Sequence, residues 1–239
     1  MFPFPGRAFP LVVALIALSL SSQACAQAYP SKPVRLLVPF APGGVSDIVA
    51  RLIAPKFSEG LGQPVVVENR VGAGGVIATE LVAKAAPDGY TLLTAFDNFS
   101  ANPYLYKSAT YDPVKDFAPV GQAVRSRIVL VVNPRLGVKT LDELVRLSNS
   151  RKDPMTYASA GGGTSSHLIA ELLKLTTGIE ATAVHYKGGA PAMTDLLGGQ
   201  VDMMVATMSI ALQHVRAGKL NAIAVTSGSR TPLLPGVPA

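Results

Sequence analysis

Two glycine-rich segments, each joining a strand pattern to a helix pattern, most constrain what this chain can fold into. They read PFAPGGVSD at 39–47 and YASAGGGTSSH at 157–167. Glycine permits the tight turn, and the helix that follows begins with N–H groups that have no partner inside the helix. The helix dipole adds partial positive charge, so each junction can bind an anion without Lys or Arg. Two such junctions far apart in the sequence predict two walls of one cleft.

The first 28 residues have the pattern of a secretory signal peptide. Arg7 precedes an apolar run over 11–20, and small residues follow at Ala24, Ala26 and Ala28. The run is too short to cross a bilayer as a helix, and the small residues form A-x-A cleavage patterns. A buried core helix is the alternative, but the terminal position and the flanks favour a signal peptide. We therefore expect the mature protein on the far side of the membrane.

Cys25 is the single cysteine of the chain and lies within this leader. After cleavage the mature protein would have no disulfide, no thiol nucleophile and no cysteine-based metal site. A lipid anchor on Cys25 is the alternative to simple cleavage. Ser22, three residues before it, is not the large aliphatic residue that a lipoprotein signal carries. We expect cleavage without an anchor.

The composition is that of a folded protein rather than a nucleic-acid binder. Hydrophobic residues make up 49% of the sequence, and the formal net charge is +6. Lys and Arg are scattered, and no basic stripe is interleaved with stacking aromatic residues. No stretch after the leader is long and apolar enough to span a bilayer. These features exclude a disordered chain and argue against nucleic acid as a partner.

Strand patterns alternate with helix patterns, the order typical of an α/β sheet with helical crossovers. The first unit has strands predicted at 34–38, 65–68 and 90–94, with helices from about Ser46 and about Gly75. Pro55 should kink the first helix or end it early. The apolar residues of that helix that we expect to face the sheet, by their spacing, are Ile48, Val49, Leu52, Ile53 and Phe57.

A second α/β unit follows, and Thr140 with Glu143 predicts a capping box at its first helix. The tail at 228–239 is rich in Gly, Ser and Pro, and the first unit would leave sheet edge uncovered unless further elements return to it. The predicted strands of the second unit are 128–133, 155–159, 182–186, 201–205 and 222–226, and its predicted helices begin at about 140, 165, 190 and 210.

Six segments together resemble the substrate-binding proteins of tripartite tricarboxylate transporters, the Bug family of extracytoplasmic solute receptors. The resemblance implies an α/β periplasmic-binding-protein fold of type II, with two lobes, a hinge and an interdomain cleft. It implies a first lobe at 29–127, a second lobe at 128–227, and 228–239 as the start of a truncated return, so that the first lobe is incomplete. The matching segments are YPSKPVRLLVPFAPGGVSD, LGQPVVVENRVGAGG, AAPDGYTLL, YASAGGGTSSHL, YKGGAPAMTDLLGGQVD and AGKLNAIAVTSGSR.

The resemblance also assigns ligand contacts to both glycine junctions. In the first, Phe40 would form an apolar wall. For Asp47 a helix-start role is favoured over ligand contact, because its charge would repel an anion. The hydroxyl groups of the second junction can cap the helix, donate to a ligand, or do both. The residues assigned to the two cradles are Gly43, Gly44 and Ser46, then Gly161, Gly163, Thr164, Ser165 and Ser166.

Departures from the family pattern bear on specificity. Asp97 stands where many members have a small uncharged residue, which favours a ligand with an amine or hydroxyl group there. Thr207 follows the VDMMV strand in place of an Asp or Asn, and His185 replaces a common proline. His167 is interpreted as packed and hydrogen-bonded rather than as a titrating base. Lys187 is a turn residue or a cleft cation, and the turn is favoured.

The sequence argues against an enzyme. GAGGVIA at 72–78 lacks the third glycine of a dinucleotide fingerprint, and no nucleophile is matched with a base. The three histidines lack zinc-site spacing, so we expect neither metal nor cofactor. The resemblance implies a monomeric periplasmic protein that captures a small carboxylate and delivers it to a membrane permease. A ligand-sensing module that presents its bound form to a membrane signalling partner is the alternative.

Overall fold

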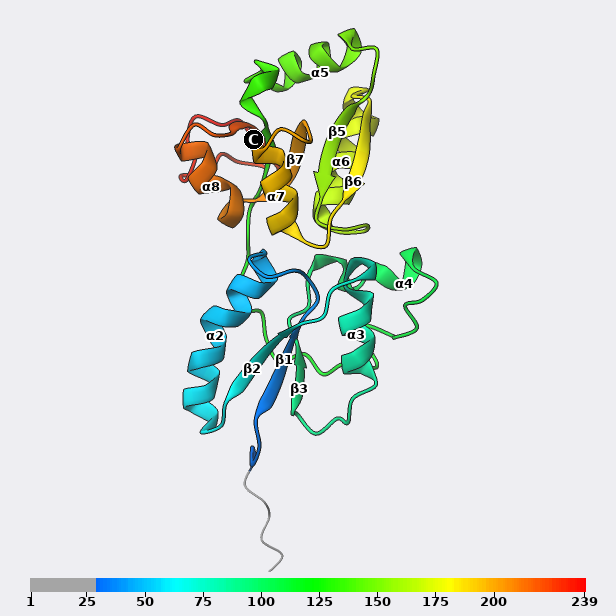
Figure 1. Ribbon diagram of the computed structural model, residues 1–239, viewed down its shortest axis with the longest axis vertical. Coiled ribbons are helices and arrows are strands. Elements are labelled where there is room, and N and C mark those ends of the chain that lie inside the picture. The colour runs from blue at the N-terminus through cyan, green and yellow to red at the C-terminus, as the bar shows by residue number, and fades with distance from the viewer. Residues whose placement is uncertain (1–28) are drawn as a thin grey trace, which may run out of the picture. The chain divides into compact units, whose positions relative to one another are not determined.

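The computed structural model describes residues 29–239, and contacts divide the chain after Ser31. The signal-peptide prediction for 1–28, with Cys25, lies outside the described residues. The unit Lys32–Ala239 contains two sheets, one of three strands and one of five, each with its own helices (Figure 1). Among residues 29–239, no helix combines the length and the apolar character that a membrane crossing needs.

The first sheet has the all-parallel order that the sequence predicts. Strand β1 (Val34–Val38) lies between β2 (Val65–Asn69) and β3 (Thr91–Leu93) and is parallel to both. Helix α2 (Val45–Leu61) connects β1 to β2, and α3 (Val76–Ala83) connects β2 to β3. The remaining short elements of this part are the 3₁₀ turns Ala73–Gly75 and Asp97–Phe99 and the helix α4 (Asn102–Leu105).

Two expectations for α2 need correction. The helix does not end early at Pro55 but continues through it to Leu61, so the hydrogen bond that the proline removes does not terminate the helix. Its buried stripe is formed by small residues, Ala50 and Ala54 among them, which let the helix lie close to β1. Of the five apolar residues expected to face the sheet, Ile53 packs partly against the core, whereas Ile48, Leu52 and Phe57 are exposed.

The second sheet has the strand order β6-β5-β7-β4-β8, and β4 runs antiparallel to both of its neighbours. Strands β5, β6 and β7 are parallel and end at one edge. Ile128, the first residue of β4, pairs with Thr207, the last residue of β7, so β4 enters the sheet from that edge and must run opposite. The strands are β4 (Ile128–Val132), β5 (Met155–Ser159), β6 (Ala181–His185), β7 (Met203–Thr207) and β8 (Asn221–Val225).

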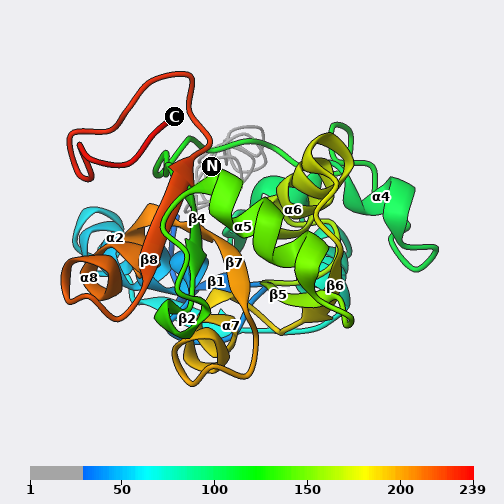
Figure 2. The same cartoon turned by 90° about the horizontal axis from the view of Figure 1, so that it is seen from above.

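Helices cover both faces of the second sheet (Figure 2). Leu130 and Val132 of β4 face α5 (Leu141–Ser150) and α6 (Ser165–Thr177). Val129 and Val131 face the other way, toward α7 (Gly189–Leu197) and α8 (Met208–Arg216), because side chains alternate along a strand. A 3₁₀ turn spans Pro134–Leu136, and the capping box predicted for Thr140 and Glu143 is present at the start of α5.

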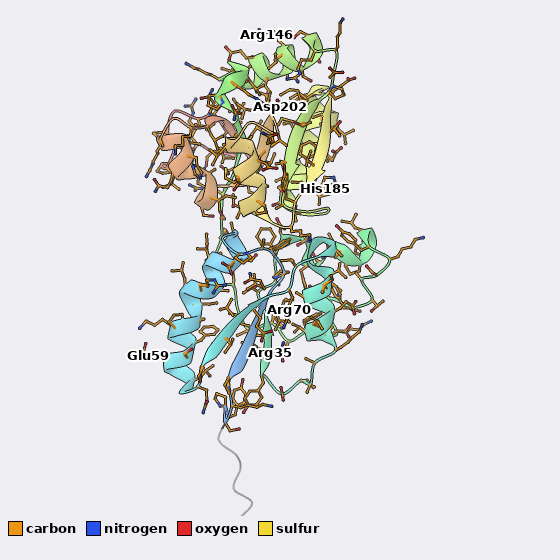
Figure 3. All side chains as sticks on the ribbon, in the orientation of Figure 1. Arg35, Glu59, Arg70, Arg146, His185 and Asp202 are labelled. Carbon is orange, nitrogen blue, oxygen red and sulfur yellow. The ribbon has the colours of Figure 1, made fainter. Side chains whose placement is uncertain are left out.

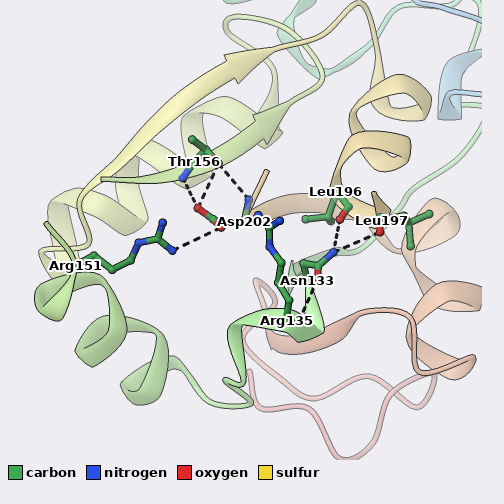
Figure 4. A network of polar contacts seen from close by, with 7 residues as sticks. All are labelled: Asn133, Arg135, Arg151, Thr156, Leu196, Leu197 and Asp202. Atoms are coloured by element: carbon green, nitrogen blue, oxygen red, sulfur yellow. Dashed lines mark hydrogen bonds and ion pairs between the residues drawn. The ribbon is translucent and has the colours of Figure 1, made fainter. Parts of the chain in front are cut away.

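A polar network closes the edge of the second sheet at which β5 and β7 begin (Figure 4). The buried carboxylate of Asp202 accepts hydrogen bonds from the Thr156 N–H at 2.9 Å and from Arg135 Nη2 at 3.2 Å. Asn133 donates to the carbonyl of Leu196 at 2.7 Å. Asp202, the aspartate of the LLGGQVD segment, is therefore a structural residue.

The tail at 228–239 packs on the second sheet, not on the first as we expected. Leu234 and Val237 join the core cluster that contains Val129 and Val225, and the N–H of Val225 donates to the Pro238 carbonyl at 2.8 Å. The physical reason is the apolar surface beside β8 and α8, which these side chains bury.

Candidate functional site

A small cavity, partly open to solvent, lies between residues of the two sheets. Both glycine junctions reach it, so the shared cleft predicted from the sequence is present. This position is typical of α/β proteins, which bind ligands at the carboxyl ends of their strands. The lining residues are Phe40, Gly44, Val45, Ser46 and Phe96 from the first part, and Ala160, Ser165, Ser166, Gly189, Met204, Val205, Thr207 and Ile210 from the second.

Asp47 stabilises the start of α2 through a hydrogen bond to the turn that precedes the helix. Gly43 has a φ of 79°, and its N–H donates to Asp47 Oδ2 at 2.9 Å. Burial pushes the pKa of Asp47 upward, but hydrogen bonds from Arg51, Gly43 and Asn69 outweigh burial, and the pKa is lowered. Asp47 is buried and is not among the residues that line the cavity, which supports the helix-start role.

Two hydroxyl groups at the cavity have unused hydrogen-bonding capacity. Ser46 Oγ and Thr207 Oγ1 are buried, and neither has a hydrogen-bond partner among the described residues. Ser46 is the second residue of α2, and Thr207 precedes α8 without capping it through its side chain. Because a buried unpaired hydroxyl costs stability, such atoms mark places where a polar ligand can bind.

The second junction, in contrast, uses most of its donors internally. The Gly161 N–H donates to Ser159 Oγ at 3.1 Å, and the Thr164 hydroxyl donates to the Gly161 carbonyl at 2.7 Å. Ser166 Oγ accepts the Ala160 N–H at 2.9 Å. Gly161, Gly163 and Thr164 are buried and are not among the lining residues, whereas Ser165 and Ser166 are. The ligand contacts assigned to this junction stay predictions, and its paired donors argue against three of them.

Asp97 reaches across the cleft to the start of α6. Its Oδ2 accepts the N–H of Ser165, the first residue of that helix, at 3.1 Å. Partial desolvation of the carboxyl group raises the pKa of Asp97, and the hydrogen bonds from Ser165 act in the opposite direction. By its accessible surface the residue is exposed, so the effect of burial on it is limited. Beside it, the rings of Phe96 and Phe40 meet edge to face with centroids 5.3 Å apart.

His167 is packed and hydrogen-bonded, as interpreted from the sequence. Its Nδ1 accepts the Gly163 N–H at 3.1 Å, and its ring lies edge to face with that of His185 at 4.8 Å. Figure 3 places His185 at the end of the second part that is nearer the first. Burial and His185 lower the pKa of His167. The sequence reasoning overlooked Glu171, one helical turn later, which accepts from Tyr157 Oη at 2.5 Å and acts on His167 electrostatically.

The start of α7 is a further wall of the cleft that the sequence reasoning missed. Gly189 lines the cavity, and the N–H of Ala41 donates to the Lys187 carbonyl at 2.8 Å. Gly188 has a φ of 137°, and a Cβ there would lie 3.2 Å from the Ala41 nitrogen. Lys187 serves this turn through its backbone, and its side chain is exposed. The sequence signal that could have predicted this wall is the pair of glycines in YKGGAP, which precedes a helix pattern.

No metal centre accompanies this cavity in the part of the chain that the structure describes. Groups of three or more His, Cys, Asp or Glu side chains that could hold a metal ion are absent from residues 29–239. The lining residues include no Lys, Arg, Asp or Glu. The cavity therefore offers helix N-termini, hydroxyl groups and apolar surface, which suit binding of a small anion.

Comparison with known proteins gives a family. A family model described as the tripartite tricarboxylate transporter family receptor matches residues 49–239.

Three solved structures are similar over most of the chain. The periplasmic binding protein BugD is 42% identical with a TM-score of 0.83, and the match covers 88% of this chain and 71% of BugD. Rpa4515 of R. palustris, solved with adipate, is 38% identical with a TM-score of 0.84, covering 88% of this chain and 71% of that one. MatC from Rhodopseudomonas palustris, with bound malate, is 36% identical with a TM-score of 0.80, covering 88% and 72%.

Proposed function

This chain belongs to the tripartite tricarboxylate transporter family of receptors, and on that premise we propose that it captures a small organic carboxylate between its two lobes. The observation that carries the proposal is the pair of buried hydroxyl groups at the same cavity, Ser46 Oγ and Thr207 Oγ1, neither of which has a hydrogen-bond partner within residues 29–239. Ser46 lies in the first turn of α2, whose N-terminus attracts negative charge. Relatives solved with adipate and with malate support a carboxylate as the ligand class.

The first carboxylate contacts come from the α2 junction. Gly44 is the N-cap of α2 and has no side chain that could cap the helix itself, so the first N–H groups of α2 remain for a ligand. The Ser46 hydroxyl adds a donor from the same turn, and the Thr207 hydroxyl adds one from the opposite lobe. Phe40 and Phe96 supply the apolar wall. The partial positive charge of these backbone donors can bind an ionised acid without a cationic side chain.

Binding of the acid would stabilise a closed arrangement of the lobes. We keep the division predicted from the sequence, with lobes at 29–127 and 128–227, although the tail at 228–239 packs on the second. A ligand that contacts Ser46 and Thr207 together makes both contacts only when the lobes are closed, so it shifts the population toward that form. The closed form would then deliver the acid to the membrane permease of a tripartite transporter, after export of the protein to the periplasm.

The test is a substitution at Gly44. Its φ is −76°, so a valine is compatible with the backbone there, but the side chain would occupy the approach to the first N–H groups of α2. We expect Gly44→Val to weaken binding of malate or adipate at least tenfold by isothermal titration calorimetry. Mass spectrometry of ligand released from the purified wild-type protein would identify the natural acid.

Gly60 provides the matched control, because it lies near the other end of α2 and a Cβ there would meet nothing within 4 Å. Gly60→Val should bind the same acids with the affinity of the wild-type protein. Equal affinities of Gly44→Val and Gly60→Val would contradict an anion site at the start of α2.

A further inference from the structure

We infer that Asp97 fills the second anion site of the cleft with a carboxylate of the protein, so that this chain selects acids with one carboxylate over acids with two. This inference rests on the proposed function and specifies its ligand class. The contact that points to it is the hydrogen bond from the Ser165 N–H to Asp97 Oδ2 at 3.1 Å.

Ser165 is where a ligand carboxylate would otherwise be expected. It is the first residue of α6, a helix of 13 residues, and it lines the cavity. The first N–H groups of a helix have no partner within it, and they favour negative charge. Asp97 supplies that charge from the opposite side of the cleft, so it takes the place of a ligand group.

Asp97 is held in place by buried neighbours. Asn98 and Asn102 are 3% and 1% exposed, and the Asn98 amide donates to Asn102 Oδ1 at 3.1 Å. Both amides also donate to the Gly74 carbonyl. Asp97 begins the short 3₁₀ turn that contains Asn98, so its carboxylate extends from a fixed backbone. These contacts order the backbone that carries Asp97, so only its side chain remains to be ordered at the helix start.

Three further donors of this junction already have protein partners. The N–H groups of Gly161 and Gly163 donate to Ser159 Oγ and His167 Nδ1, and the Thr164 hydroxyl donates to the Gly161 carbonyl. A ligand carboxylate placed there would also meet the charge of Asp97 at short range, and like charges repel. A hydroxyl group could instead donate to Asp97.

The α2 end of the cavity is different. Ser46 is only 6% exposed and lines the cavity, and its Oγ has no hydrogen-bond partner among the described residues. The neighbouring carboxylate, Asp47, accepts the Gly43 N–H and forms an ion pair with Arg51 at 3.0 Å. The α2 end of the cleft therefore accepts an anion. At the other end, the lining residue Ser165 already has an anionic partner in Asp97, which is not itself among the lining residues. The ligand that fits is a small acid with one carboxylate and a hydroxyl group at its far end.

Two matched pairs of acids test this selection. Succinate is compared with 4-hydroxybutyrate, and adipate with 6-hydroxyhexanoate, so that each pair differs only in the far group. We expect the wild-type protein to bind the hydroxy acid of at least one pair at least tenfold tighter than its dicarboxylate by isothermal titration calorimetry. In Asp97→Asn, which keeps the size and removes the charge, the ratio of the two affinities should shift at least tenfold toward the dicarboxylate.

Glu59→Gln is the control, because it removes one negative charge from an exposed position near the far end of α2. Its ratio should equal that of the wild-type protein. If the dicarboxylate binds the wild-type protein as tightly as the hydroxy acid, or if Asp97→Asn leaves the ratio unchanged, the inference is wrong while the carboxylate receptor stands. If neither acid of either pair binds, the proposed function fails together with the inference.

Discussion

At the scale of single residues, the cleft separates groups that serve the fold from groups that serve a ligand. Ser46 and Ser166 both follow a glycine junction, and both are buried. Ser166 Oγ accepts the Ala160 N–H, whereas Ser46 Oγ has no partner in the part of the chain that the structure describes. The same residue type in a similar local sequence therefore has a structural role in one lobe and an available hydroxyl group in the other.

The two serines give opposite predictions. Ser46→Ala should weaken binding of a small carboxylate about fivefold, while the free energy of unfolding rises by about 1 kcal/mol, because a buried unpaired hydroxyl is removed. Ser166→Ala should lower the free energy of unfolding by about 1 kcal/mol, because it leaves the Ala160 N–H unpaired. Urea unfolding and calorimetric titration measure both quantities. A stability loss in Ser46→Ala would mean that its hydroxyl group already has a structural partner.

Glu68 gives a prediction of pH dependence. The hydrogen bond from Arg35 lowers the pKa of Glu68 from 4.5 to about 2, burial opposes this shift, and Arg70 adds to it. Arg35 and Arg70 lie close together in Figure 3. Because the folded protein holds the carboxylate ionised, this pair stabilises the fold above about pH 4.5, and the contribution is lost as the pH falls toward 2.

Replacement of Glu68 by Gln should therefore lower the free energy of unfolding at pH 7 by about 1 kcal/mol, the scale of an exposed ion pair, and should have little effect near pH 2. Urea unfolding at the two pH values measures the difference. An equal loss at both would show that packing of Glu68, rather than its charge, stabilises the sheet.

At the scale of elements, the contact between α4 and the second junction sets how closely the lobes approach. Tyr106, at the end of α4, donates from its hydroxyl to the Gly162 carbonyl at 3.1 Å. A Cβ on Gly162 would lie only 2.5 Å from Tyr106 Oη, and one on Gly74 would lie 2.9 Å from the Gly162 carbonyl oxygen. A Cβ at Gly162 would therefore have to displace the Tyr106 hydroxyl, and one at Gly74 would press on the backbone of the other lobe as well.

Gly162→Ala should therefore disfavour the closed arrangement and weaken binding of a small acid at least tenfold. The double variant Gly162→Ala with Tyr106→Phe removes the clashing oxygen, and the next ring atom would lie 3.6 Å away, so most of the affinity should return. Titration calorimetry of both variants tests the contact. Unchanged affinity in Gly162→Ala would mean that ligand binding does not require this approach of the lobes.

At the scale of the whole molecule, the fold brings together residues that are distant in the sequence. Ser165 meets Asp97, Gly162 meets Tyr106, and the Ala41 N–H meets the Lys187 carbonyl. Each of these contacts joins the first lobe to the second. The receptor function proposed here depends on such contacts, because a ligand in the cleft competes with them or adds to them.

The sequence by itself determined the order of strands and helices, the capping box at Thr140, the two glycine junctions and the family. These features depend on residues within a few positions of one another, through periodicity, turn conformation and helix capping. The glycine junction indicated Gly44 and Ser46, and the family resemblance added Phe40 and Thr207; all four line the cavity. Gly189 followed the same pattern and was overlooked.

Only the tertiary structure decided which face of α2 is buried, which way β4 runs, where the tail packs and which donors of the second junction are free. The Gly163 N–H donates to His167 in the helix that follows, and the Ser165 N–H donates to Asp97 of the other lobe. A hydrogen-bond donor is available to a ligand only if no protein acceptor already pairs with it. That depends on which distant side chains the fold brings within reach.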